Sequence, residues 1–425
     1  MKQFIQKNSL ILAMLSAVAT SAAYADEIGE IVVSKAGINN TTQVAIVPFL
    51  GDASGSRALV ELLNDAELNT TNQKLPHNPQ SAREILDNIQ AWQSQGFSHV
   101  VIGKSHSIVG NKIAISYEII DTAQALPIGS PRTQISDNNP AALNHANKQI
   151  GNHIYHAITG DNADFDGQIA YIEESSSEPK ISTLKLIDPT GKNARTLFST
   201  QGSILSPAFS PDGLQIAYTV QRPNALPVIY TQSINGGEPK LATPFWGHNL
   251  SASFSPDGNQ LLFSGSHDNN NPNIYSLDLI QKNLKALTNL SGAENSPRAL
   301  ASGTGFIFTA DHGGRTQNLY QQDYGSQNAK KIADNVSNPQ LNKTGNQVVY
   351  ANNQGIVVAN LSGSVLHRLP VNGTEISPSF SPSSNKIVYS VKTGNQSKLV
   401  IYSLKNKTSK TLATTGIVRD PVWSK

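Results

Sequence analysis

The chain has 425 residues, which is long enough for one large domain and one small one. It contains no cysteine, so disulfides and cysteine chemistry are excluded. With 32 basic and 30 acidic residues and no basic run, the balanced charge argues against nucleic acid or an anionic membrane as a partner.

Residues 1–25 have the plan of a secretory signal peptide. Lys2 and Lys7 precede an apolar run from Leu10 to Ala19, and Ala23-Tyr24-Ala25 provides a cleavage site of small residues. Neither this run nor any later segment reaches the roughly 20 apolar residues that span a bilayer. We therefore expect export of a protein that does not span the membrane.

The segment that follows predicts a small α/β domain over residues 43–160, after a polar lead over residues 26–42. The lead contains one apolar run, Ile31 to Val33, and fits either an edge strand or a mobile tail. Beyond it, strand and helix patterns alternate. Strands are expected at Gln43 to Phe49, Ser98 to Gly103 and Lys112 to Asp121, and helices at Arg57 to Leu68, Pro79 to Gln95 and Asn139 to Ile158.

Residues 161–425 are built from a repeated unit. Ser206 to Gly213 reads Ser-Pro-Ala-Phe-Ser-Pro-Asp-Gly, and related copies begin at Ser251, Ser296, Asn338 and Ser377. In the complete copies a Pro-Asp-Gly turn separates two β-rich runs, because proline presets φ, aspartate caps the turn and glycine tolerates positive φ. Each unit is therefore predicted to begin as strand, turn, strand.

The spacing of the repeat predicts the architecture. An aromatic residue in the second strand recurs about every forty residues, the period of a four-stranded propeller blade, at Tyr171, Tyr218, Phe263, Phe308, Tyr350 and Tyr389. Gln168 to Tyr171 is a second strand without a first, and Arg419 to Ser424 is a first strand without a second. Together they complete a sixth blade. We predict a mainly β fold: a six-bladed β-propeller closed by the last strand and preceded by the α/β domain.

Motifs for catalysis are absent from the sequence. No Gly-x-Ser-x-Gly elbow and no His-Glu-x-x-His motif occurs, so we predict that the protein is not an enzyme and has no catalytic residue, metal site or cofactor. Gly103-Lys104-Ser105 resembles the end of a phosphate-binding loop, but Ser98 stands where that motif requires glycine.

Two groups of polar residues have features of a metal site. One matches the spacing of a calcium-binding loop at Asn162, Asp164, Asp166, Gly167 and Glu173. A strand pattern follows it, so we interpret the stretch as a polar linker and keep calcium as the alternative. The other consists of three histidines on one predicted helix, which lack a carboxylate at ligand spacing and are interpreted as surface or packing residues: His145, His153 and His156.

The loops that precede the first strand of each blade should gather around one mouth of the propeller channel. The loop Phe245-Trp246-Gly247-His248-Asn249 stands out, because an aromatic pair beside polar residues is typical of a protein contact. The alternative is that Phe245 and Trp246 pack between blades. The sequence leaves both interpretations open.

Several segments outside the repeat motif carry a family resemblance. They are Trp92 with Gly96, Val100 to Gly103, Leu143 to Ala146, Ile154-Tyr155, Ile158 to Gly160, Asn273 to Leu279 and Pro421 to Ser424. Together with the repeats, these segments resemble the TolB family, the periplasmic propeller subunits of the Tol-Pal cell-envelope system. The family's Ser-Gly-x-Phe segment is missing from Asn69 to Leu75.

The resemblance implies a monomeric, non-enzymatic periplasmic protein that binds the lipoprotein Pal and the inner-membrane protein TolA. In that role it would support outer-membrane integrity and invagination during cell division. Carried over, the Pal-facing residues would be Phe245, Trp246, His248, Asn249, Ser251, Ala293, Glu294 and Asn295. The TolA-binding segment would be Asp26 to Ile38, with Asp26, Glu27, Ile28, Ile31, Val32 and Val33.

As the mechanism we predict a switch, in which the N-terminal segment either docks against the body or is released, and Pal binding biases the choice by linkage. Two other functions stay open at this stage. One is a periplasmic scaffold that binds glycan or peptidoglycan. The other is a propeller hydrolase or lyase, which would require several acidic or histidine side chains to converge in the channel.

Overall fold

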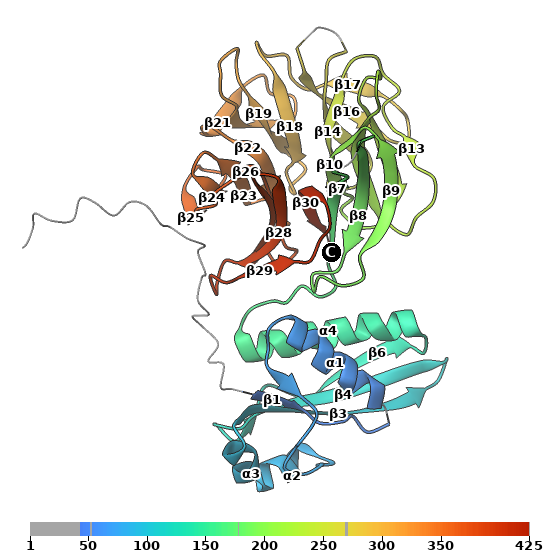
Figure 1. Cartoon of the computed structure of the whole chain (residues 1–425), viewed down its shortest axis with the longest axis vertical. Coiled ribbons are helices and arrows are strands. Elements are labelled where there is room, and N and C mark those ends of the chain that lie inside the picture. The colour runs from blue at the N-terminus through green and yellow to red at the C-terminus, as the bar shows by residue number, and fades with distance from the viewer. Residues whose placement is uncertain (1–42, 52, 177, 268–270, 425) are drawn as a thin grey trace, which may run out of the picture.

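The computed structural model describes residues 43–51, 53–176, 178–267 and 271–424, which form a small α/β domain and a β-propeller (Figure 1). The predicted signal peptide lies outside the described residues. So does the predicted TolA-binding segment with its six named residues, Asp26, Glu27, Ile28, Ile31, Val32 and Val33.

The α/β domain contains a six-stranded sheet in the order β2-β1-β3-β4-β5, with β6 also paired to β4. The strands are β1 (Gln43–Ile46), β2 (Thr70–Thr71), β3 (Phe97–Ile108), β4 (Lys112–Asp121), β5 (Leu126–Pro127) and β6 (Arg132–Asp137). The helices are α1 (Ala53–Asp65), α2 (Ala82–Asp87), α3 (Ile89–Ser94) and α4 (Pro140–Thr159). The predicted strands at β1, β3 and β4 are confirmed, whereas β2, β5 and β6 are additional.

Helix α4 is bounded by the signals that the sequence carries. The side chain of Asn139 accepts a hydrogen bond from the amide of Ala142, and proline occupies the first turn. Gly160 ends the helix with a φ of 68° and donates to the carbonyl of His156. Ile150 and Ile154 pack with the core of the domain, so α4 covers one face of the sheet together with α1.

The predicted single helix from Pro79 to Gln95 is wrong, because the structure has two short helices there. Asn88 ends α2 and begins α3, with a φ of −118° that is not helical. Its side chain donates to the carbonyl of Glu84, which is the local hydrogen bonding by which asparagine competes with a continuous helix. The apolar stripe survives the break, since Ile85 and Trp92 are both fully buried.

The propeller consists of six four-stranded sheets, which confirms the predicted fold. The first blade in sequence comprises β10 (Ser203–Phe209), β11 (Gln215–Gln221), β12 (Val228–Ser233) and β13 (Lys240–Leu241). The second comprises β14 (Asn249–Phe254), β15 (Gln260–Gly265), β16 (Asn273–Asp278) and β17 (Leu284–Ala286). The third comprises β18 (Glu294–Ala299), β19 (Gly305–Ala310), β20 (Asn318–Asp323) and β21 (Ala329–Ala333).

The fourth blade comprises β22 (Ser337–Leu341), β23 (Gln347–Asn352), β24 (Gly355–Asn360) and β25 (Val365–Leu369). The fifth comprises β26 (Thr374–Phe380), β27 (Lys386–Thr393), β28 (Gln396–Ser403) and β29 (Ser409–Leu412). The sixth comprises β30 (Ile417–Ser424), β7 (Gln168–Glu174), β8 (Ile181–Ile187) and β9 (Arg195–Gln201). The last sheet joins the final described strand to the beginning of the propeller. In it, β30 pairs antiparallel with β7, so the ring is closed as predicted.

The repeat motif works as its residue types indicate. In the complete copy, Gly213 has a φ of 71°, and Asp212 accepts a hydrogen bond of 2.9 Å from the amide of Leu214. Ser210 Oγ accepts from the amide of Gln215 at 2.9 Å, so the motif closes the turn between β10 and β11. The recurring aromatic residues are all buried and pack against the adjacent blade: Tyr171, Tyr218, Phe263, Phe308, Tyr350 and Tyr389.

Every inner strand contains a bulge, which the sequence did not reveal. The pairing register shifts within β10, β14, β18, β22, β26 and β30, each against its second strand. A residue with left-handed φ lies at each shift: Ser206, Ser251, Ser296, Asn338, Glu375 and Asp420. Bulges turn the following side chains, so these positions decide which residues point into the channel.

Candidate functional site

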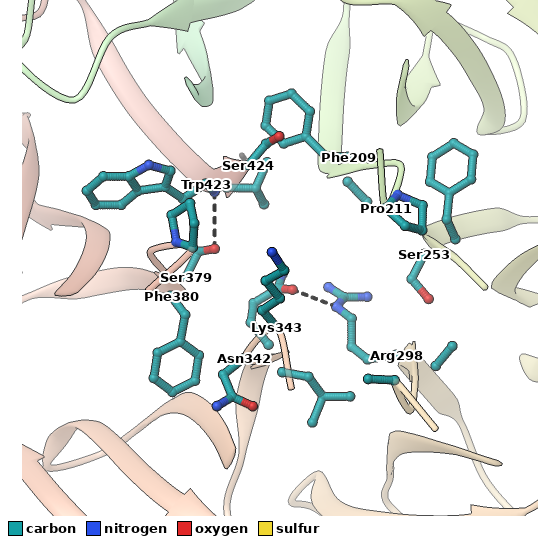
Figure 2. A pocket seen from close by; sticks show the side chains of 18 of the residues that line it. Phe209, Pro211, Ser253, Arg298, Asn342, Lys343, Ser379, Phe380, Trp423 and Ser424 are labelled. Carbon is teal, nitrogen blue, oxygen red and sulfur yellow. Dashed lines mark hydrogen bonds between the residues drawn. The ribbon is translucent and has the colours of Figure 1, made fainter. Parts of the chain in front are cut away.

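The inner strands enclose a cavity of about 440 Å³ along the propeller channel. Its lining combines aromatic side chains with Arg298 and Lys343; Figure 2 shows Arg298 and the aromatic rings around the opening and Lys343 near its middle. The cavity includes the turn residues Ser381 and Pro382, so it lies toward the C-terminal ends of the inner strands. The predicted Pal-facing loops lie at the opposite ends.

The described residues that line this cavity include two cations and no aspartate, glutamate or histidine. This composition differs from the convergent acidic or histidine side chains that a propeller hydrolase or lyase would require. Elsewhere among the described residues, no three His, Asp or Glu side chains gather closely enough to hold a metal ion.

At the other mouth of the channel, the predicted aromatic pair is divided between two roles. Trp246 is 84% exposed, whereas Phe245 is partly buried and packs against the core of its blade. The ring of Phe245 contacts the ring of His267 edge to face, with centroids 5.4 Å apart. The structure thus places Trp246 in solvent on a loop that Phe245 anchors. An exposed contact residue fits Trp246 and packing fits Phe245, so neither interpretation holds for both residues.

The neighbouring polar residues hold this loop in shape. Asn249 is fully buried, and its side-chain amide donates to the carbonyls of Phe245 and Gly247 at 3.2 and 3.1 Å. His248 is exposed, and its backbone amide donates to Ser266 Oγ at 3.0 Å. Ser251 carries the left-handed φ of the bulge in β14.

His267 is a further residue of this site that sequence reasoning missed. Its Nδ1 lies 2.6 Å from the carbonyl oxygen of Trp246, and its ring packs against Tyr275 with centroids 4.7 Å apart. It therefore connects the backbone of the exposed tryptophan to the blade. No recognisable motif surrounds His267, and only the three-dimensional contact identifies it.

The second predicted loop lies beside the first, at the beginning of β18. Glu294 is fully buried, where its carboxylate accepts hydrogen bonds from the hydroxyl of Thr288 and from the amide of Leu290. Burial raises the pKa of Glu294. Ser264 Oγ of β15 donates to the carbonyl of Glu294 and lies 3.2 Å from the amide oxygen of Asn295, which ties the two blades together. The partly buried Ala293 completes the loop.

The linker and the α/β domain contact the propeller through buried polar groups. Asp164 accepts hydrogen bonds from the amide and hydroxyl of Ser383 at 3.2 and 2.8 Å. Lys386 donates to the carbonyl of Ala163 at 3.2 Å, and its ammonium lies 5.3 Å from the centre of the Tyr155 ring. These contacts fix the linker against the turn that follows β26.

Residues of the two candidate metal sites contact other protein groups. Asp164 binds Ser383, Asp166 accepts from Asn152 at 3.0 Å, and Glu173 pairs with Lys185 at 2.6 Å, so these carboxylates point to different partners. His153 Nδ1 lies 3.0 Å from the hydroxyl of Tyr117. The remaining motif, Gly103-Lys104-Ser105, lies inside strand β3 rather than in a loop.

Comparisons with known proteins agree with this architecture. Residues 155–425 match the family model described as the TolB beta propeller domain. The chain belongs to the TolB family. Within the described part of the chain, no helix is long and apolar enough to cross a membrane.

Individual relatives of the TolB family extend this result. The Tol-Pal system protein TolB of Haemophilus influenzae strain PittGG is 29% identical over 247 residues, covering 56% of this chain and 56% of the relative. That of Acinetobacter baylyi is 31% identical over 212 residues, covering 49% and 48%. The chain thus spans about half the length of these two relatives. The crystal structure of TolB from Acinetobacter baumannii matches with a TM-score of 0.75 at 28% identity, over 92% of this chain and 98% of that one.

Proposed function

We propose that this chain is a non-enzymatic, periplasmic interaction component of the Tol-Pal system. In this proposal it links the inner-membrane protein TolA to the lipoprotein Pal, and thereby supports outer-membrane integrity and invagination during cell division. Membership of the TolB family supports the proposal, as do the Tol-Pal relatives.

The observation that carries the proposal is the exposure of Trp246, which is 84% accessible although it adjoins an anchored aromatic residue. Tryptophan is enriched among the residues that dominate protein interfaces, and its large ring would bury a wide apolar area against a partner. Asn249 and His267 hold its loop from both sides. A loop that is already ordered loses less entropy on binding.

The adjacent loop extends the proposed surface toward the third blade. Ala293 and Asn295 are partly accessible, whereas the buried Glu294 holds the loop through Thr288 and Leu290. We assign contact to Trp246, His248, Ser251, Ala293 and Asn295, and loop support to Phe245, Asn249 and Glu294. The proposed Pal-binding surface thus comprises both loops at this mouth of the channel.

Calorimetric titration of the purified protein with the soluble domain of Pal, and separately with TolA, tests the proposal. We expect both to bind. A variant that lacks Asp26 to Ile38 should retain Pal binding and lose TolA binding. Absence of Pal binding, or unchanged TolA binding by the shortened variant, would contradict the proposal. Cosedimentation with purified peptidoglycan tests the alternative scaffold function. Sedimentation of this protein with peptidoglycan in the absence of Pal would support that alternative.

A further inference from the structure

One ring of equivalent positions in the channel has a member unlike the others. Each position of this ring lies on the inner strand of one blade. It pairs with the second-strand residue that comes immediately before the recurring aromatic residue. All six members line the cavity: Ala208, Ser253, Arg298, Gln340, Ser379 and Val422. Five are small or uncharged, so Arg298 introduces a single cation into an otherwise neutral ring.

Arg298 is buried, with only 9% of its surface exposed. Not every N–H donor of its guanidinium has a hydrogen-bond partner in the described part of the chain. Its Nε donates to Gln340 Oε1 at 2.9 Å and its Nη1 donates to the carbonyl of Pro297 at 2.7 Å. Among the described residues, Nη2 has no hydrogen-bond partner and no carboxylate lies within 4.0 Å of the guanidinium. The nearby Asp420 is paired with Arg419 at 2.8 Å.

Burial without a counter-ion is costly for a charged side chain. It lowers the pKa of Arg298 to about 10, which still leaves the guanidinium protonated at neutral pH. The arginine therefore brings a charge that no described carboxylate contacts, and a free donor, into the channel; the charge of Asp420 offsets the effect of burial only in part. A second donor lies on the neighbouring strand, where the buried hydroxyl of Ser253 also has no partner among the described residues.

The rest of the wall defines what could satisfy these donors. Figure 2 shows Arg298 and Ser253 on adjoining stretches of the wall, with Lys343 near the middle of the opening. Phe209, Phe254 and Trp423 supply apolar surface. Since the described lining has no acidic side chain, a cation would be repelled. The planar guanidinium matches a carboxylate, and because Nε and Nη1 are already engaged, Nη2 and the Ser253 hydroxyl remain as the donors, which is enough for one carboxylate.

We propose that the propeller channel binds a carboxylate group at Arg298, with Arg298 Nη2 and the Ser253 hydroxyl as donors. The carboxylate could belong to a free small molecule or to an acidic protein side chain that enters the channel. Both share the chemistry that the ring recognises. The site is distinct from the proposed Pal-binding surface, because it lies toward the opposite ends of the inner strands.

Saturation-transfer NMR of the purified protein tests this site with three probes at constant ionic strength: acetate, N-acetylglutamate α-amide and its neutral glutamine analogue. We expect saturable acetate binding by the wild type and a loss of about tenfold or more in Arg298→Gln. Ser253→Ala should weaken binding severalfold. Arg368→Gln is the matched control, since Arg368 also pairs with a glutamine, at 3.4 Å, but is exposed on the outer strand β25.

Binding of acetate alone would assign the site to free small carboxylates. Binding of the glutamate probe as well, but not of its glutamine analogue, would show that acidic side chains are accepted. Equal acetate binding by the wild type and Arg298→Gln would overturn the proposal, and so would the absence of saturable binding by the wild type. If Arg298→Gln fails to fold, Arg298→Lys replaces it, because lysine keeps the charge and loses the fork, so unchanged affinity would again contradict the site.

Discussion

Trp423 of β30 and Ile169 of β7 are directly paired in one antiparallel ladder, although almost the whole propeller lies between them in the sequence. The backbone amide of Trp423 also donates to Ser379 Oγ of the adjacent blade at 3.2 Å. Its side chain packs with Ile169, Tyr171 and Val388. One residue therefore joins the first and last segments of the ring to the blade beside them.

Replacing Trp423 by alanine should strongly destabilise the protein. Truncation of a buried tryptophan typically costs about 3–5 kcal/mol, and here the cavity would form at the closure of the ring. Trp246→Ala is the matched control: its side chain is 84% exposed, so the free energy of unfolding should change by no more than about 0.5 kcal/mol. Chemical denaturation compares them, and equal losses would contradict the assigned role of Trp423.

Removal of the Asp164 side chain should loosen the linker from the propeller. Asp164→Ala leaves both donors of Ser383 without their partner, at a cost of about 1–3 kcal/mol. Asp164 has a left-handed φ of 57°, which strains alanine more than asparagine, so Asp164→Asn should be less destabilising than Asp164→Ala. Asp166→Ala in the same linker serves as the control, because it removes only one exposed hydrogen bond, from Asn152. Limited proteolysis should cut the Asp164→Ala linker faster; equal rates would refute this prediction.

His153 should make stability depend on pH. Burial, followed by the charges of Arg132 and His156, lowers the pKa of His153 below 6.5. Its Nδ1 lies 3.0 Å from the Tyr117 hydroxyl, and burial favours the neutral ring, so the stability it provides is complete above about pH 6.5 and is lost as pH falls through the lowered value. His153→Gln should flatten the fall in unfolding free energy below that pH. His145→Gln, on an exposed part of the same helix, should leave the slope unchanged; an equal effect of both would count against His153.

The bulges should tolerate glycine but not a β-branched residue. Ser206 has a φ of 48°, a conformation that costs L-residues about 1–2 kcal/mol and β-branched ones most. We expect Ser206→Val to lower the thermal unfolding midpoint and Ser206→Gly to leave it nearly unchanged. Ser203→Val, at the start of the same strand, should have little effect. A stable Ser206→Val variant would show that the bulge can be rearranged.

The blades could be predicted because each repeats a local signal. The Pro-Asp-Gly turn and the buried aromatic residue act within one blade, so the sequence displays them directly. The closure at Trp423 could also be predicted, because one strand remained unpaired at each end of the repeat. The break at Asn88 could not, since the apolar stripe through Ile85 and Trp92 continues across it.

The site was less predictable, because it depends on contacts between distant residues. Asn249 and Glu294 were expected to face a partner, yet both are buried and hold loops. Nothing adjacent in sequence marks His267 as the support of Trp246. Arg298 could have been found by aligning the repeats, since it occupies the position of Ala208, Ser253 and Ser379 in the other blades.

The most direct test of the proposed function compares the affinity for Pal of two variants, each of which has one truncated side chain on the same blade. Ile280, in the turn after β16, is 77% exposed and lies at the end of the blade opposite Trp246, because β14 and β16 run in the same direction. We predict that Trp246→Ala weakens Pal binding by about 2 kcal/mol, roughly thirtyfold in Kd, whereas Ile280→Ala leaves it unchanged. Wild-type affinity of the Trp246→Ala variant would contradict the assignment of this mouth of the channel to Pal.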